Sequence, residues 1–320
     1  MKFVIVGAGA LGSIVAAHLA RAGTPVSLVA RGRRADHVEA HGVQLAGLAE
    51  FTVPVPVIRP GDGPVDGDVV ILCVKAYDTE AALAPLRFTG RPVALSLQNG
   101  VLKNEDLARH FGADNVLGAA ASVSGELLAD GTTRFTMNER LPIGEPSGPR
   151  SRRVDDIAAA LKSAGIAAVA VDNIATVEWT KYTGFLPLFS AALLTRQATW
   201  RNLADPHASA AIARLVREMV ALATASGVAV EDQGGFPVAS IAAAPPAEAA
   251  ATIQRFGQAM KTRAPQHRVS ALQDLLRGGR LEVDAILGHA VRLGQRLGVP
   301  VPTIETCHQF CAVLDGLREE

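Results

Sequence analysis

Three glycines near the amino terminus have the spacing of a phosphate-binding turn. An apolar run leads into Gly7, Gly9 and Gly12, and an Ala/Leu-rich stretch follows directly. In such a strand–turn–helix unit the first glycine permits the tight turn, the second lets a pyrophosphate approach the backbone, and the third lets the helix lie on the strand. The N–H groups of the helix's first turn, at Ala10 and Leu11, then point at the phosphates. Between a strand and a helix, this spacing predicts a dinucleotide site.

Arg31 stands where a site of this kind selects its cofactor. An acidic residue at the end of the second strand holds the ribose 2′-hydroxyl of NAD(H), whereas an arginine accommodates the 2′-phosphate of NADP(H). The segment contains no acid and has Arg31, Arg33 and Arg34. We therefore expect NADP(H) with Arg31 as its main phosphate contact. Whether Arg33 or Arg34 also reaches the 2′-phosphate stays open, and the alternative is that these arginines solvate a loop.

Lys75 and Asn99 each follow an apolar run that is typical of a buried parallel strand. The runs span residues 69–74 and 92–97. In an open α/β sheet, ligands lie outside the carboxyl ends of the strands, so Lys75 and Asn99 should face the same crevice as Gly9. Taken alone, an asparagine before a glycine would be an ordinary turn residue.

The order of the elements predicts two domains. Strand and helix patterns alternate up to residue 172, including an irregular β pair over residues 132–143, and only helical patterns follow. We therefore expect an α/β Rossmann domain over 1–172 and an all-α domain over 173–320. The helices of the second domain are expected over 176–194, with interruptions at Gly184 and Pro187, and over 206–226, 246–258, 282–297 and 303–318.

The composition favours a small molecule as the protein's partner. Of the 320 residues 49% are hydrophobic and 19% are charged, and the formal net charge is +0, which gives no electrostatic case for nucleic acid or a membrane surface. Cys73, Cys307 and Cys311 lack the companions that a disulfide framework or a zinc site needs, so no metal is expected. No stretch has the pattern of a signal peptide or a membrane span, so we expect a cytoplasmic protein.

Motifs beyond the glycine turn narrow the function. They are Lys75, the Gln-Asn-Gly of residues 98–100, the Trp-Thr-Lys that ends at Lys181, and Ser-Ala-Leu-Gln-Asp over 270–274 followed by Leu-Glu-Val-Asp over 281–284. In this order the chain resembles the ketopantoate reductase family (2-dehydropantoate 2-reductases) over nearly its whole length. The resemblance implies a Rossmann domain followed by a helical domain like that of 6-phosphogluconate dehydrogenases. It also implies NADPH-dependent reduction of a 2-keto acid to a 2-hydroxy acid, ketopantoate to pantoate in pantothenate biosynthesis.

The resemblance assigns roles to five residues. The family's catalytic lysine matches Lys181, its partner glutamate Glu282, its substrate-contacting serine Ser270, its active-site asparagine Asn99, and the lysine beside the nicotinamide Lys75. Hydride transfer to a keto carbon leaves negative charge on the carbonyl oxygen, which an ammonium group stabilises and protonates. Burial and cationic neighbours would draw the pKa of such a lysine towards neutrality, while the glutamate would offset that shift and hold the lysine in place.

Each of these residues also has an ordinary structural interpretation. A lysine on an apolar helix, such as Lys181, usually reaches out to solvent along its methylene chain. Glu282 would be an acid in the first turn of a helix, and Ser270 would be a helix N-cap.

Two aromatic residues depart from the family pattern. Members that reduce ketopantoate place asparagines four and eight residues after the catalytic lysine, one and two helix turns along the same face. This chain has Phe185 and Phe189 there. A pocket without a hydrogen-bond partner for the substrate hydroxyl loses about 1–3 kcal/mol of binding free energy for a substrate that carries this group. We therefore expect Phe185 and Phe189 to line a drier pocket for a more apolar 2-keto acid, whose identity the sequence does not give. Arg196 could hold the carboxylate, although an exposed arginine at a helix end is the favoured interpretation.

Two other functions stay open. An NAD-dependent 2-hydroxy acid dehydrogenase could use the same scaffold, but Arg31 argues against it. A regulator that binds NADPH without turnover would have no use for the proton donor Lys181 or for Glu282. The helical domain and the resemblance are compatible with a homodimer.

Overall fold

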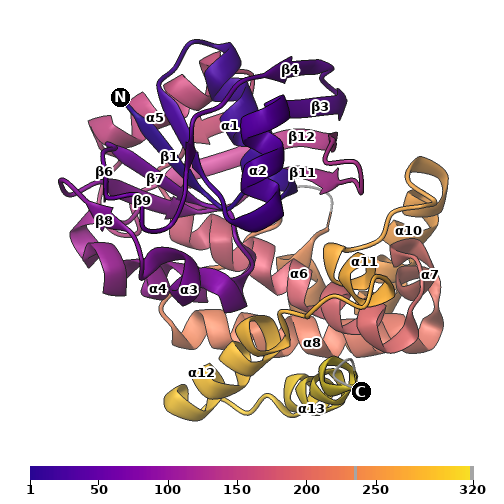
Figure 1. Ribbon diagram of the computed structural model, residues 1–320. Helices are drawn as coiled ribbons and strands as arrows, with labels where there is room; N and C mark the ends of the chain where they lie inside the picture. The colour runs from indigo at the N-terminus through magenta and orange to yellow at the C-terminus, as the bar shows by residue number, and fades with distance from the viewer. Residues whose placement is uncertain (234–235, 318–320) are drawn as a thin grey trace. The chain divides into compact units, whose positions relative to one another are not determined.

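The computed structural model describes residues 1–233 and 236–317 and divides into two compact units, 1–175 and 176–320. The first unit contains a parallel-sheet Rossmann fold and the second is helical, which confirms the fold class expected from the sequence (Figure 1). The division falls in the first turn of α6 (Ile174–Thr195).

A five-stranded parallel sheet organises the first unit. Its order is β5–β2–β1–β7–β9, and the strands are β1 (Phe3–Val6), β2 (Val26–Val29), β5 (Val57–Ile58), β7 (Val69–Leu72) and β9 (Val93–Ser96). β1 pairs with β2 on one side and with β7 on the other, so the order of the strands reverses there. Such a reversal opens a crevice at the carboxyl ends of the strands, where ligands bind in folds of this kind.

The strands are continuous apolar runs because both faces of the sheet are covered. Phe3 and Ile5 of β1 point into one core cluster, and Val4 and Val6 point into another. The first cluster includes α1 (Ala10–Arg21) and α5 (Arg152–Ser163). The second includes residues of α3 (Thr79–Leu83) and α4 (Leu102–Phe111).

A second sheet packs on the far side of α1. It runs β10–β12–β3–β4, with β11 and β13 also paired to β12. The expected β pair over 132–143 is instead the single strand β12 (Thr133–Gly144), which pairs with β11 (Ser122–Leu127) through two register shifts. The bulges that cause these shifts bend the pair and account for its irregular sequence pattern. The remaining elements are α2 (Gly32–His41), β3 (Val43–Gly47), β4 (Phe51–Val53), β6 (Pro64–Val65), β8 (Arg87–Phe88), β10 (Gly118–Ala119), β13 (Ala168–Ala170) and the 3-10 turns η1 (Ala76–Asp78) and η2 (Ala113–Asn115).

All regular elements in the described part of the second unit are helical. They are α6, α7 (Thr199–Ala204), α8 (Pro206–Ala225), α9 (Val238–Ala243), α10 (Pro246–Arg263), α11 (Ser270–Leu276), the π turn η3 (Asp284–Gly288), α12 (His289–Leu297) and α13 (Pro302–Gly316). The sequence did not reveal α7, α9 or α11, because six or seven residues are too short to show a helical period. The expected end of the last helix, Arg318, lies outside the described residues.

The expected interruption of α6 at Gly184 and Pro187 is wrong. The helix continues through both residues for 22 residues. A proline removes one backbone hydrogen bond from a helix, a loss that tertiary packing can outweigh. Leu188, directly after Pro187, and Ala191, one turn beyond it, pack on a core formed by α7, α8, α9 and α10.

Candidate functional site

The glycine turn leaves one side of its backbone open. Gly7 has a φ of +109°, and a Cβ there would lie 2.6 Å from Val74 Cγ1. A Cβ on Gly12 would lie 1.9 Å from the carbonyl oxygen of Gly7, so the fold itself requires both glycines. A Cβ on Gly9 would meet no described atom within 4 Å. Because Gly9 is also the N-cap of α1, this free space lies at a helix N-terminus, where a pyrophosphate can approach the amides of Ala10 and Leu11.

Arg34 braces the glycine turn from within the protein. Its Nε donates to the carbonyl oxygen of Ala8 and its Nη2 to Ser13 Oγ, both at 2.9 Å. Its Nη1 donates to the carbonyl oxygen of Gly131, also at 2.9 Å. The three bonds join α2, the glycine turn and the turn between β11 and β12. Arg34 is therefore engaged in the framework of the turn, and a contact of Arg33 or Arg34 with the 2′-phosphate stays a prediction.

Arg31 is presented to solvent beside an acid. It is the N-cap of α2, two residues after the end of β2, and its side chain is 71% exposed. Arg31 Nη2 lies 3.6 Å from Asp78 Oδ1. Asp78 belongs to η1, three residues after Lys75 and at the carboxyl end of β7. An acid from the loop after β7 thus lies beside the arginine that follows β2.

Gln98 joins the two loops that carry Lys75 and Asn99. Its side chain is 6% exposed, and its Nε2 donates to Val74 O and to Thr79 Oγ1, both at 2.9 Å. Lys75 lies between these two acceptors in the chain, and Asn99 follows Gln98 directly. The buried amide therefore fixes the loop after β9 to the loop after β7.

Lys103 supports the same loop from α4. It is 4% exposed, and its Nζ donates to the carbonyl oxygens of Gln98, at 3.1 Å, and Ala119. Gln98 and Lys103 are not among the site residues predicted from the sequence. The position of Gln98 inside the Gln-Asn-Gly motif was a usable signal, whereas nothing in the sequence shows that Lys103 is buried.

In the second unit, α6 carries Lys181, Phe185 and Phe189 at intervals of four residues, hence along one face. Lys181 and Phe185 are half-buried. Phe189 is 1% exposed and its ring centroid lies 5.9 Å from that of Phe185. Phe189 therefore packs in the core, whereas Phe185 keeps part of its surface exposed, and the prediction that the two rings line a substrate pocket stays a prediction.

Glu282 and Ser270 occupy different surroundings. Glu282 is half-buried between the buried Leu281 and Val283, two residues before η3. Ser270 is exposed and is the first residue of α11, whose N-cap is Val269. The interpretation of Ser270 as an N-cap is thus wrong, because the chain enters the helix one residue earlier.

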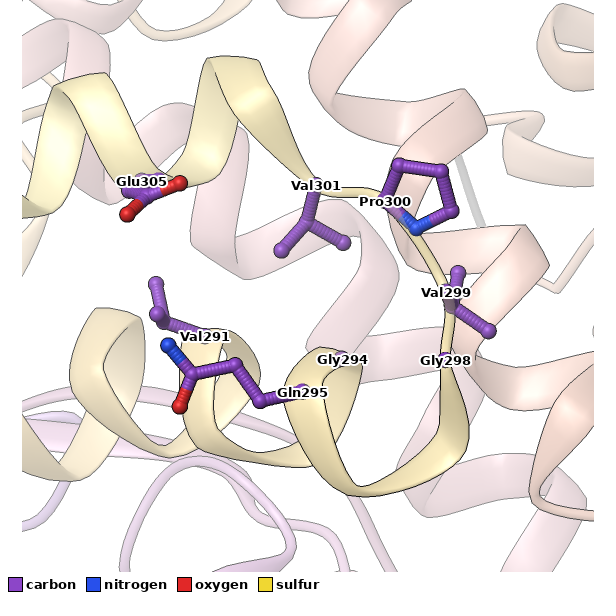
Figure 2. Close-up of a pocket in the computed structure, with 8 residues that line it drawn as sticks. All are labelled: Val291, Gly294, Gln295, Gly298, Val299, Pro300, Val301 and Glu305. Carbon is purple, nitrogen blue, oxygen red and sulfur yellow. The ribbon is translucent and has the colours of Figure 1, made fainter.

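A cavity of about 320 Å³ lies between α12 and α13 (Figure 2). None of the eight residues that line it is a predicted site residue, and its polar side chains are Gln295 and Glu305 alone. Glu305 is the one titratable side chain in this lining.

The described residues contain no group of three or more His, Cys, Asp or Glu side chains that could hold a metal ion. Burial raises the pKa of the thiols of Cys73 and Cys307, and that of Cys311 to about 12, so these cysteines are poor nucleophiles. Across residues 1–233 and 236–317, no helix is long and apolar enough to span a bilayer.

Two family models match the two parts of the chain. The model for ketopantoate reductase PanE/ApbA matches residues 3–148, and the model for its C-terminal part matches residues 173–314. The chain belongs to the ketopantoate reductase family. The resemblance inferred from the motifs is confirmed, and this member is an oxidoreductase of that family.

Comparison with individual relatives points to the same family. The chain is 30% identical to the 2-dehydropantoate 2-reductase of Mesorhizobium japonicum over 95% of both chains. It is also 30% identical to that of Archaeoglobus fulgidus, over 92% of this chain and 91% of the relative. The crystal structure of a PanE/ApbA family ketopantoate reductase from Ralstonia eutropha JMP134 superposes over 100% of both chains with a TM-score of 0.83 at 27% identity.

A more distant likeness shows the fold alone. The ternary structure of D-mandelate dehydrogenase with NADH and anilino(oxo)acetate has a TM-score of 0.85 over 100% of both chains at 18% identity. In this ketopantoate reductase family member, Gly9, Arg31, Lys75 and Asn99 all follow the carboxyl ends of strands of one sheet. Lys181 and Glu282 are carried by the helical unit.

Proposed function

We propose that the protein uses NADPH to reduce a 2-keto acid to a 2-hydroxy acid. The observation that supports the proposal is that a chain of this family with an open dinucleotide turn also has Lys181 and Glu282, the residues that the motif resemblance assigns to catalysis. A dinucleotide-binding protein without catalytic activity needs the turn but not the proton donor.

The residues of the first unit fit NADPH. The open backbone at Gly9 and the first turn of α1 suit the pyrophosphate. Arg31 is exposed at the end of β2, where a guanidinium can pair with the 2′-phosphate. Lys75 and Asn99 follow β7 and β9, towards the nicotinamide end. When bound, NADPH supplies the hydride that reduces the keto carbon.

Lys181 is the proposed general acid. As the keto carbon is reduced, its ammonium stabilises the negative charge on the substrate oxygen and then gives that oxygen a proton, which Lys181 regains from solvent. The Glu282 carboxylate orients the ammonium. Asn99 and Ser270 donate hydrogen bonds to the substrate's oxygens.

The proposed substrate is a 2-keto acid more apolar than ketopantoate. Phe185 stands where the family's ketopantoate-reducing members have an asparagine, and its half-buried ring removes a partner for a substrate hydroxyl. Phe189 packs behind Phe185 and limits its movement.

A substrate panel tests the proposal. NADPH consumption is measured with ketopantoate and with straight-chain, branched and aromatic 2-keto acids, using wild type, Lys181→Ala and the control Lys162→Ala, an exposed lysine of α5. We expect turnover of at least one acid and a loss of roughly 10²- to 10⁴-fold in kcat for Lys181→Ala only, the range for removal of a general acid. Failure of every acid, or full activity of Lys181→Ala, would overturn the proposal.

One observation favours a second candidate, an NAD-dependent 2-hydroxy acid dehydrogenase. The Asp78 carboxylate lies 3.6 Å from Arg31 and could accept a hydrogen bond from a ribose 2′-hydroxyl. The dissociation constants of NADPH and NADH decide between the two, since tighter NADH binding supports the dehydrogenase. Tight NADPH binding without turnover would instead support a regulator.

Assembly as a homodimer stays a prediction. Light scattering of the purified full chain tests it, because the dimer has twice the mass of the 33.3 kDa monomer.

A further inference from the structure

Tyr182 makes a buried hydrogen bond that links two catalytic segments of the helical unit. It directly follows Lys181 on α6 and is 1% exposed. Its hydroxyl donates to the carbonyl oxygen of Ile286 at 2.5 Å. Burial raises the pKa of the phenol, so the hydroxyl keeps its proton and acts as a donor.

The acceptor is tied in turn to Glu282. Ile286 lies in the π turn η3, and its N–H donates to the carbonyl oxygen of Glu282 at 3.0 Å. The Ile286 peptide groups thus connect the backbone of Glu282 to the side chain next to Lys181. π turns of this kind are rare and occur frequently at functional sites.

A bidentate ion pair fixes the shape of the same turn. Arg292 Nη1 donates to Asp284 Oδ1 at 2.7 Å, and its Nη2 donates to Oδ2 at 3.2 Å. The pair passes over Gly288, where a Cβ would lie 2.5 Å from Asp284 Oδ1 and 3.1 Å from His308 Nε2. His289 and His308 are the other titratable groups that influence Asp284. The turn is therefore held from two sides, by Tyr182 and by Arg292.

We propose that Tyr182 is a positioning residue, whose hydroxyl holds the π turn against α6 and thereby sets the position of Glu282 relative to Lys181. The inference rests on the proposed function for the roles of Lys181 and Glu282. Because its side chain is 1% exposed, Tyr182 acts through the backbone of residues 282–286 and not on a ligand directly.

Tyr182→Phe tests the proposal because it removes only the hydroxyl. The ring that packs at 5.9 Å from Trp179 stays in place. Loss of one hydrogen bond should lower kcat by about 3- to 10-fold, while the NADPH dissociation constant stays unchanged. If Glu282 moves away, the Lys181 ammonium loses stabilisation, so the basic limb of the kcat/KM profile should shift to lower pH.

Two controls separate positioning from general stability. Trp179→Phe disturbs the packing of the Tyr182 ring but leaves its hydroxyl bond; it should lower Tm without moving the basic limb. In a Glu282→Gln background, Tyr182→Phe should cause no further pH shift, because the two changes act on the same interaction. A lowered Tm with an unmoved basic limb in Tyr182→Phe would overturn the proposal.

A labelling experiment keeps this test independent of turnover. The rate at which Lys181 reacts with acetic anhydride, followed by mass spectrometry as a function of pH, reports the pKa of that amine in wild type and in Tyr182→Phe. A lower pKa in the variant supports the positioning role even if no 2-keto acid is reduced, in which case only the proposed function fails. An identical pKa in both proteins overturns the positioning role whatever the activity.

Discussion

The Arg31 guanidinium lies 3.6 Å from the Asp78 carboxylate, so a base from the end of β2 meets an acid from the loop after β7. The two side chains are 71% and 38% exposed, and an ion pair this exposed costs little to break. A 2′-phosphate that pairs with Arg31 must approach this carboxylate. A ribose hydroxyl would instead gain an acceptor from it. If the cofactor binds as proposed, the charge of Asp78 should therefore affect the balance between NADPH and NADH.

Asp78→Asn should favour NADPH. Removing the negative charge should tighten NADPH binding by up to about 5-fold, the equivalent of about 1 kcal/mol, and leave NADH binding equal or weaker. Arg31→Ala should instead weaken the binding of NADPH. Fluorescence titration measures both constants, with Asp156→Asn, an acid of α5, as the control. Unchanged NADPH affinity in Asp78→Asn would show that the cofactor's ribose lies elsewhere.

Gln98→Leu should loosen the loops that carry Lys75 and Asn99. The substitution keeps the size of the buried side chain but removes its bonds to Val74 and Thr79. Leaving such buried groups without partners should lower the free energy of unfolding by about 1–3 kcal/mol, measured in urea. The KM for NADPH should rise as well. Loss of stability with an unchanged KM would mean that the amide serves the fold alone.

The sequence could predict the elements whose chemistry is local. The spacing of Gly7, Gly9 and Gly12 is a property of one strand–turn–helix unit, and the structure has β1, the turn and α1 there. Residue type alone could not separate the roles of Arg31 and Arg34. The distinction depends on Gly131, which lies about one hundred residues away in the chain and accepts a bond from Arg34.

Burial was the other property that the sequence could not give. Phe185 and Phe189 share a helix face by spacing, but only the packing of the remaining helices makes one half-buried and the other fully buried. The π turn over residues 284–288 is likewise invisible in a sequence pattern that fits an α-helix equally well. Its hydrogen bond to Tyr182 joins residues 104 positions apart.

From the surroundings of His18 we predict that the free energy of unfolding depends on pH. Its Nδ1 lies 2.9 Å from Ala164 O and so carries the donated proton, whereas its buried Nε2 has no partner among the described residues. Burial, and to a smaller extent Arg21, lowers the pKa of the ring below 6.5, although the bond to Ala164 opposes the shift. The unfolded chain therefore binds a proton at a pH where the folded protein does not. This contribution to stability is complete above pH 6.5 and is lost as the pH falls towards the folded pKa.

Urea unfolding between about pH 7 and pH 5 measures this effect. The free energy of unfolding of wild type should fall with pH, and His18→Leu should flatten that part of the slope, because leucine has no charge to gain. His207→Asn, at an exposed position of α8, serves as the control and should keep the wild-type slope. An equal slope in His18→Leu would assign the pH dependence to other groups.

Two measurements on variants of Arg196 distinguish a role in the backbone conformation at the end of α6 from a role in binding the substrate. Among residues 1–233 and 236–317 it is the only non-glycine residue with a positive φ, +56°, and its N–H donates to Ala192 O at the end of α6. Glycine adopts this conformation without a Cβ clash, so Arg196→Gly should raise the free energy of unfolding by about 0.5–1 kcal/mol, whereas Arg196→Val should lower it. Because the side chain is exposed, the KM for the 2-keto acid should stay unchanged in both variants. A KM that rises on Arg196→Gly would instead identify Arg196 as a ligand of the substrate carboxylate, since a guanidinium that pairs with it bidentately cannot be replaced by glycine.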